Sequence, residues 1–308
     1  MNYVTSYVNP DLDGTACMIA MAALRGKHSL AIAKGEGGWE PVRFGENDFE
    51  TEFVLEKLGL PAPCKVSDIS DADAVILVDT HHKLQLPENF PYDKVIQIID
   101  HHLNGDVDDF PNAEIINLNI GAAATIVADM YIKADIWDEK MLRLLAFAMN
   151  SNTVEFKGAL TKDFDRDVYA KIIEKYPISK QDISDMMHAR LKILDLGLRT
   201  AIESDIKVFD TKHGQVGIAQ LKMPGLLSAM DLAKAEKELC AIARDMGLKY
   251  FFMNASDTEI IKSVIITVNP ETAEIVGNLL GVKFNGATHE FDRVLVRKKD
   301  LVFDKDGD

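Results

Sequence analysis

The sequence predicts an α/β protein of two domains, and three observations support this. The chain has 308 residues, its first half alternates short apolar runs with helical patterns, and the pattern changes near residue 190. At about 150 residues per domain, this length fits two domains. We therefore expect one domain at residues 1–190 and a second at residues 191–308, with the boundary placed to within about ten residues.

Strands and helices follow one another in the expected first domain. Strands are predicted at residues 3–8, 74–78 (AVILV) and 95–99 (VIQII), and helices at residues 15–24, 122–132 and 139–149. Short apolar runs bounded by turn residues are typical of strands buried on both faces. Strands that alternate with helices are joined by right-handed crossovers, so we expect a mostly parallel sheet flanked by helices.

Residues 163–203 are expected to be largely helical, with a break near Tyr176-Pro177, and residues 183–202 are expected to form the connector between the domains. Beyond it the pattern predicts strands at residues 206–209, 215–221, 249–254 and 260–268, and helices at residues 228–246 and 270–280. These elements indicate a smaller α/β domain with a mixed sheet.

The composition narrows the classes of function. Lys and Arg number 34 against 49 Asp and Glu, a net charge of −15, which repels nucleic acid at long range. The sequence contains no run of about 18 uncharged apolar residues, so no membrane helix is expected. The first residues lack the basic and apolar regions of a signal peptide. Three widely spaced cysteines, Cys17, Cys64 and Cys240, fit a reducing compartment. We therefore expect a cytoplasmic protein, and an anionic ligand would need a local positive site.

Acidic and imidazole side chains follow three of the predicted strands. Residues 9–14 (NPDLDG) follow the first strand, Asp79 follows AVILV, and residues 100–102 (DHH) follow VIQII. The carboxyl ends of parallel strands meet at one edge of a sheet, where crowded carboxylates need cations or protons between them. A single Asp in such a place is often a cap or turn residue. Three in succession favour a site for Mn, Mg, Fe, Co or Zn, and two such ions can clamp a phosphoryl group and activate water.

The ordered set of motifs resembles the DHH phosphoesterase superfamily. Besides residues 9–14, Asp79 and residues 100–102, the similarity includes residues 121–126 (GAAATI), 150–157 (NSNTVEFK), 205–209 (DIKVF) and 296–299 (VRKK). The last two resemble phosphate-binding elements of the second domain called DHHA2. The chain is similar over nearly its whole length to manganese-dependent (family II) inorganic pyrophosphatases and exopolyphosphatases.

This resemblance implies a role for each matching residue. The metal ligands would be Asp11, Asp13, Asp79 and His101, holding one or two ions, expected to be Mn with Co or Mg as alternatives. Asp79 would bridge the ions, and His102 would help to protonate the leaving group. Substrate would contact His81 together with Lys207, Arg297 and Lys298, the last three binding the terminal phosphates. The relatives also include homodimers joined at sheet edges.

Two positions depart from the family pattern. Tyr7 stands where a metal-binding His is usual, and Asn152 stands where a metal-binding Asp is usual. A neutral phenol and a carboxamide are weaker ligands for these ions, so we expect weaker metal binding, a changed metal preference or an inactive site. Three functions remain open. The protein hydrolyses pyrophosphate or short polyphosphate, it is a phosphoesterase for another small phosphorylated substrate, or it is a catalytically silent homologue that binds a phosphorylated ligand or a protein partner.

Overall fold

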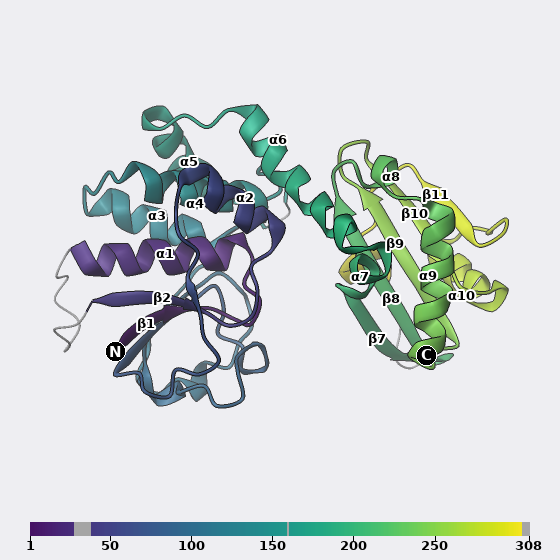
Figure 1. Cartoon of the computed structure of the whole chain (residues 1–308), viewed down its shortest axis with the longest axis horizontal. Coiled ribbons are helices and arrows are strands. Elements are labelled where there is room, and N and C mark those ends of the chain that lie inside the picture. The colour runs from purple at the N-terminus through teal and green to yellow at the C-terminus, as the bar shows by residue number, and fades with distance from the viewer. Residues whose placement is uncertain (28–37, 159, 304–308) are drawn as a thin grey trace. The chain divides into compact units, whose positions relative to one another are not determined.

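The computed structural model describes residues 1–27, 38–158 and 160–303, with the backbone but not the side chains of Lys27 and Lys298 (Figure 1). The chain forms two compact units, residues 1–186 and residue 187 onward. Each unit has its own sheet and its own core, so each is described by itself.

The first unit contains a six-stranded sheet whose strand pairs are all parallel. In the order in which they lie in the sheet, its strands are β3 (Cys64–Lys65), β2 (Trp39–Arg43), β1 (Asn2–Thr5), β4 (Ala74–Val78), β5 (Val95–Asp100) and β6 (Glu114–Asn117). The predicted parallel sheet is therefore confirmed. The strand order reverses between β1 and β4, and in open α/β sheets ligands bind beyond the carboxyl ends of strands at such a reversal.

The described α-helices of this unit are α1 (Leu12–Lys27), α2 (Phe49–Leu58), α3 (Ala123–Lys133), α4 (Glu139–Asn152) and α5 (Asp163–Lys175), and α6 (Lys180–Ala189) runs across its end at residue 186. Helices α1, α3 and α4 pack against one another (Figure 1). Ala16, Cys17 and Ala20 of α1 are fully buried, and their small side chains let the neighbouring helices approach closely. Helix α4 starts at Asp138, whose carboxylate accepts a hydrogen bond from the backbone N–H of Met141.

Short 3-10 turns lie in the connections on either side of β5: η1 (Lys83–Gln85), η2 (Tyr92–Lys94) and η3 (Val107–Asp109). Leu86, Phe90 and Phe110 from these connections pack with Leu77 and Ile98 of the sheet in one buried cluster. These apolar anchors hold down the loops that follow β4 and β5.

The second unit contains a five-stranded mixed sheet, as expected. Its strands, in sheet order, are β11 (Thr288–Phe291), β10 (Lys262–Thr267), β9 (Tyr250–Asp257), β8 (Gly214–Met223) and β7 (Ile206–Thr211). Strands β8 and β9 pair in parallel, and the other neighbours pair antiparallel. The helical segments are η4 (Arg190–Leu196), α7 (Leu198–Glu203), α8 (Leu226–Ala229), α9 (Leu232–Asp245), α10 (Pro270–Leu280) and α11 (Arg297–Asp300).

The helix expected at residues 228–246 is divided in two. Asp231 accepts hydrogen bonds from the backbone N–H groups of Ala233 and Lys234 and so starts α9 as a new helix. An N-cap residue has extended backbone angles, which interrupts any helix that precedes it. Helix α10 has the predicted bounds because Asn269 caps it and Pro270 occupies its first turn.

Candidate metal centre

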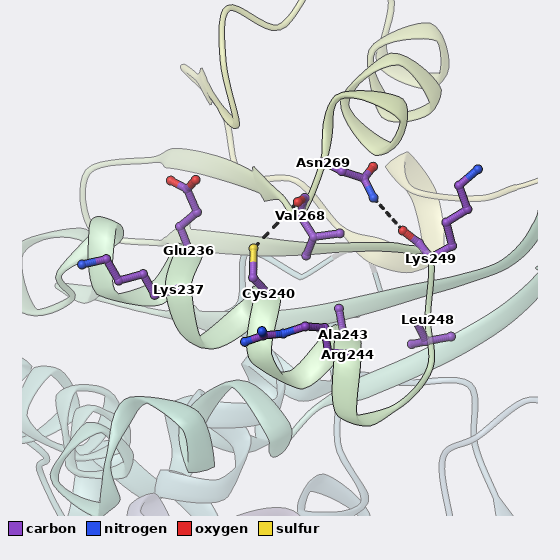
Figure 2. A pocket seen from close by; sticks show the side chains of 9 residues that line it. All are labelled: Glu236, Lys237, Cys240, Ala243, Arg244, Leu248, Lys249, Val268 and Asn269. Carbon is purple, nitrogen blue, oxygen red and sulfur yellow. Dashed lines mark hydrogen bonds between the residues drawn. The ribbon is translucent and has the colours of Figure 1, made fainter.

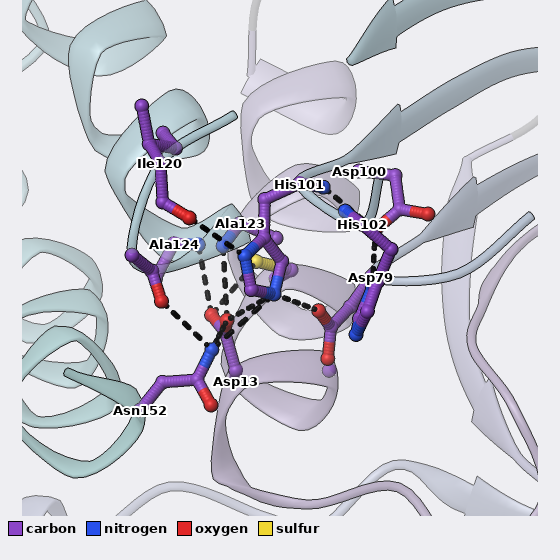
Figure 3. Close-up of polar contacts among 12 residues, drawn as sticks. Asp13, Asp79, Asp100, His101, His102, Ile120, Ala123, Ala124 and Asn152 are labelled. Atoms are coloured by element: carbon purple, nitrogen blue, oxygen red, sulfur yellow. Dashed lines mark hydrogen bonds and ion pairs between the residues drawn. The ribbon is translucent and has the colours of Figure 1, made fainter. Parts of the chain in front are cut away.

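Three of the four predicted metal ligands converge at the ends of neighbouring strands. The Nε2 atom of His101 lies 3.3 Å from Oδ1 of Asp79 and 3.8 Å from Oδ2 of Asp13 (Figure 3). All three side chains are buried. Asp79 directly follows β4 with a left-handed backbone angle (φ 59°), a conformation that Asp and Asn adopt more readily than most residues.

The orientation of the His101 ring is set by its other nitrogen. Nδ1 lies 3.0 Å from the carbonyl oxygen of Ile120, to which it donates a proton. In the neutral ring Nε2 then carries a lone pair, directed toward Asp79. Two acceptors that face each other at 3.3 Å need a proton or a cation between them. Because Oδ1 of Asp79 receives no other hydrogen bond from the described residues, this pair fits a divalent cation.

The electrostatics of the cluster also favour added positive charge. Burial alone would lower the pKa of His101, but its hydrogen bond to Asp79 and the charge of Asp13 raise that pKa. Burial raises the pKa of Asp79 and of Asp13 above the usual carboxylate range. The cluster therefore retains a proton at neutral pH, and a bound cation would take the place of that proton.

Asp13 is held by the start of α3. Its two oxygens accept hydrogen bonds from the backbone N–H groups of Ala123 (2.9 Å) and Ala124 (2.8 Å). Nδ2 of Asn152 donates to Oδ2 of Asp13 at 2.8 Å and lies 3.3 Å from Nε2 of His101 (Figure 3). The carboxamide of Asn152 thus lies beside two candidate ligands, and its NH2 group points toward them.

Tyr7 and Asp11 are arranged differently from the other three. The Tyr7 hydroxyl accepts a hydrogen bond from the backbone N–H of Asp11 at 3.1 Å. Oδ1 of Asp11 accepts from the N–H groups of Asp13 and Gly14 and so caps the start of α1. Burial, followed by the charges of Asp11 and Asp79, raises the pKa of Tyr7 far above its ordinary value. The phenol therefore stays neutral and supplies no anionic ligand.

Asp100 binds three imidazole-bearing residues at once. Its Oδ1 accepts from Nδ1 of His102 at 2.8 Å and from the backbone of His101, and its Oδ2 pairs with Nδ1 of His81. Burial opposes ionisation, but the hydrogen bonds from His102 and His81 lower the pKa of Asp100 to about 2. Ligand atoms of Asp79, Asp100, His101 and His102 all lie within 4.8 Å of one another. Both oxygens of Asp100 and both oxygens of Asp13 already accept hydrogen bonds from the protein, so Asp13 and Asp100 are both candidates for a third ligand beside Asp79 and His101.

His81 and His102 differ in access to solvent. The His102 side chain is 43% exposed, whereas that of His81 is 2% exposed. A Cβ atom at Gly105 would lie 1.9 Å from the His81 ring, so the loop at Gly105 covers that ring directly. Of the two histidines that share Asp100, His102 is therefore the one open to a ligand.

The predicted phosphate-binding residues lie in the second unit. Arg297 is largely buried, and its guanidinium donates to Oδ1 of Asp205 at 2.7 Å and to the carbonyl oxygen of Asp205 at 3.2 Å. Lys207 is exposed on β7, opposite Ile218 of β8. The side chain of Lys298 lies outside the described part of the structure. Asp205 belongs to the motif at residues 205–209, but its pairing with Arg297 was not predicted.

A separate hollow of about 610 Å³ lies in the second unit (Figure 2). It is lined by residues of α9 and of the segments around β9 and β10, among them Cys240, whose Sγ donates to the carbonyl oxygen of Val268 at 3.7 Å. Histidine is absent from the described residues that line this hollow. The carboxylate and imidazole groups described above belong to the first unit, so the candidate metal centre is there.

Comparison with protein families agrees with this two-unit fold. Residues 2–149 match the DHH family, N-terminal domain, and residues 184–302 match the DHHA2 domain. The chain belongs to the DHH family of phosphoesterases, in the form that carries a DHHA2 domain. The resemblance drawn from the motifs is thus confirmed.

Within this family the chain is related to manganese-dependent inorganic pyrophosphatases. It is 29% identical over 321 residues to the enzyme of Methanocaldococcus jannaschii, which covers 98% of this chain and 97% of that one. It is 28% identical over 307 residues to that of Methanothrix thermoacetophila, with 97% and 96% covered.

Solved structures give the same picture. A Methanococcus jannaschii protein described as a family II inorganic pyrophosphatase superposes with a TM-score of 0.71 at 27% identity, over 98% of this chain and 97% of that one. An exopolyphosphatase-related protein from Bacteroides fragilis shares the fold, with a TM-score of 0.51 at 14% identity over 97% and 89% of the two chains.

Among the described residues, no helix is both long and apolar enough to span a membrane.

Proposed function

We propose that this protein is a metal-dependent hydrolase of phosphoanhydride bonds, acting on pyrophosphate or short polyphosphate. The observation that carries the proposal is the buried pair of acceptors, Nε2 of His101 and Oδ1 of Asp79, which face each other at 3.3 Å without a second donor to Asp79 among the described residues. Asp13, Asp79 and His101 would hold one ion, for which manganese is the expected metal and cobalt and magnesium are alternatives. Asp11 and Asp79 would hold a second ion more weakly, because Tyr7 supplies no imidazole.

Each residue has a distinct task in this mechanism. A bound metal supplies a Lewis acid and a water of lowered pKa. Asp100 orients His102 through Nδ1, which leaves Nε2 on the exposed side to deliver a proton to the leaving phosphate. Arg297, with Lys207 and Lys298, would neutralise the terminal phosphate. His81 was expected to contact substrate; because Gly105 covers it, we assign it to holding Asp100.

Phosphate release tests this function directly. The full chain is assayed with pyrophosphate and with tripolyphosphate in the presence of Mn²⁺, Co²⁺ or Mg²⁺. We expect release that depends on the metal and is removed by a chelator. Release no greater than the blank with every metal and both substrates would overturn the proposal.

A catalytically silent, ligand-binding homologue is the second candidate. It is favoured by Asn152, whose amide NH2 group donates to Asp13 and faces His101. A carboxylate at this position would attract a metal ion instead. Calorimetry distinguishes the two. Binding of pyrophosphate without release of phosphate would support this second candidate, and turnover would exclude it.

Substitution of Arg297 tests the phosphate-binding role of the second unit. We expect Arg297→Ala to weaken pyrophosphate binding by about 1.5–3 kcal/mol, the usual contribution of a charge-assisted hydrogen bond. The matched control is Arg293→Ala, since Arg293 is an exposed arginine of the same unit that pairs with Asp300. An unaltered dissociation constant for Arg297→Ala would show that Arg297 serves only to bind Asp205.

A further inference from the structure

One peptide group links the candidate ligand His101 to a carboxylate outside the motifs. The carbonyl of Ile120 accepts the proton of His101 Nδ1, and the N–H of the next residue, Gly121, donates to Oδ2 of Asp165 at 2.9 Å. The carbonyl and the N–H belong to the same peptide group, which is planar and rigid. The direction of the carbonyl is therefore fixed by Asp165.

We propose that Asp165 is a positioning residue for the metal centre, acting on His101 through the peptide group between Ile120 and Gly121. This inference rests on the proposed function, because it assumes that His101 binds the metal. Histidine ligands usually donate their second N–H to a carboxylate or a carbonyl, which fixes the tautomer and strengthens the ligand. Here a buried carboxylate acts on the histidine indirectly, through the peptide group that lies between them.

The surroundings of Asp165 suit this role. It is fully buried in the first turn of α5, and its oxygens also accept from the N–H of Lys162 (2.8 Å) and the hydroxyl of Thr125 (2.6 Å). Thr125 lies in the first turn of α3, the turn whose backbone N–H groups hold Asp13. The same carboxylate thus braces the supports of two candidate ligands.

Charge adds to geometry in this arrangement. A carboxylate on the N–H side of a peptide polarises it and makes its carbonyl oxygen a stronger acceptor, because hydrogen bonds in series reinforce one another. The stronger bond to Nδ1 increases the electron density of the imidazole and favours metal binding at Nε2. The approach is close: a Cβ at residue 121 would lie 2.5 Å from Cγ2 of Thr153 and 3.1 Å from Oδ2 of Asp165, so glycine is needed there.

The test is Asp165→Asn in the full chain, with Mn²⁺ affinity measured by calorimetry after metal removal. The asparagine oxygen still accepts from Gly121 while the charge is lost, so we expect the affinity to fall about 10- to 100-fold. The matched control is Asp257→Asn in the second unit. Asp257 is also fully buried and accepts from backbone N–H groups, including those of Gly225 and Leu227. Its substitution should leave Mn²⁺ affinity within about twofold of the wild type, and unchanged affinity in folded Asp165→Asn overturns the inference.

Nitrogen NMR of the wild type decides the matter if the variant does not fold. With Mg²⁺ as a diamagnetic probe, the His101 signals, assigned by their loss in His101→Gln, should show Nδ1 protonated and Nε2 shifted on binding. A ring protonated on Nε2 in the Mg²⁺-bound protein overturns the inference. The results for the inference and for the proposed function can be told apart. If the wild type releases phosphate and Asp165→Asn binds Mn²⁺ as tightly as the wild type does, only the inference is refuted. Weaker Mn²⁺ binding by Asp165→Asn, with no release from the wild type, refutes only the hydrolase.

Discussion

Asp79→Asn should weaken Mn²⁺ binding by more than about 100-fold and abolish metal-dependent phosphate release. The lower bound follows because loss of a residue that merely supports a ligand already costs about 10- to 100-fold in affinity. The same substitution should raise the melting temperature of the metal-free protein at pH 7. Burial and the charge of Asp13 raise the pKa of Asp79, so at neutral pH its ionised form opposes folding, and a neutral amide removes that cost.

Calorimetry and thermal melts of the metal-free protein check both parts. Asparagine tolerates the left-handed backbone angle of residue 79, so the change tests charge and not conformation. Asp135→Asn is the matched control, since Asp135 has a similar angle (φ 55°) but is exposed. Mn²⁺ affinity that survives Asp79→Asn would remove Asp79 from the set of ligands.

Asn152→Asp should tighten Mn²⁺ binding at least about tenfold and destabilise the metal-free protein. Nδ2 of Asn152 donates to Oδ2 of Asp13 at 2.8 Å, so a carboxylate at this half-buried position replaces a hydrogen bond by repulsion from the buried charge of Asp13. A divalent cation relieves that repulsion, and a charge-assisted contact worth about 1.5–3 kcal/mol corresponds to tenfold or more in affinity. Adding Tyr7→His should increase the gain, because an imidazole then joins Asp11 and Asp79.

Melting curves with and without Mn²⁺ give the clearest readout. The variant should melt below the wild type without metal and gain more from added metal. Asn278→Asp, an exposed position on α10, controls for the added negative charge. Equal Mn²⁺ affinities for wild type and Asn152→Asp would mean that residue 152 does not contact the ion.

The fold was most predictable where strands are fully buried. The runs AVILV (74–78) and VIQII (95–99) are apolar apart from Gln97, which makes them easy to identify as strands, and the structure places strands there. The strand Trp39–Arg43 was missed because Pro41 and charged residues interrupt its pattern, and Glu114–Asn117 was missed because it is a short, partly exposed edge strand. The connections on either side of β5 show no helical period, which agrees with the 3-10 turns found there.

The candidate site was predictable to the extent that strand ends define it. Asp79 and His101 directly follow the adjacent strands β4 and β5, and Asp13 lies in the first turn of α1, the helix after β1, so the topology brings the three together. Asp165 reads in the sequence as an ordinary residue at a helix start, because its bond to Gly121 joins positions 44 residues apart. The covering of His81 could not be predicted either, since it depends on how the following loop folds back.

The contact between Asp13 and Asn152 joins residues 139 positions apart, and α3 supplies the amides between them. These two residues can meet only when the chain has folded as far as α4, so the surroundings of Asp13 are set by tertiary contacts and not by its local sequence.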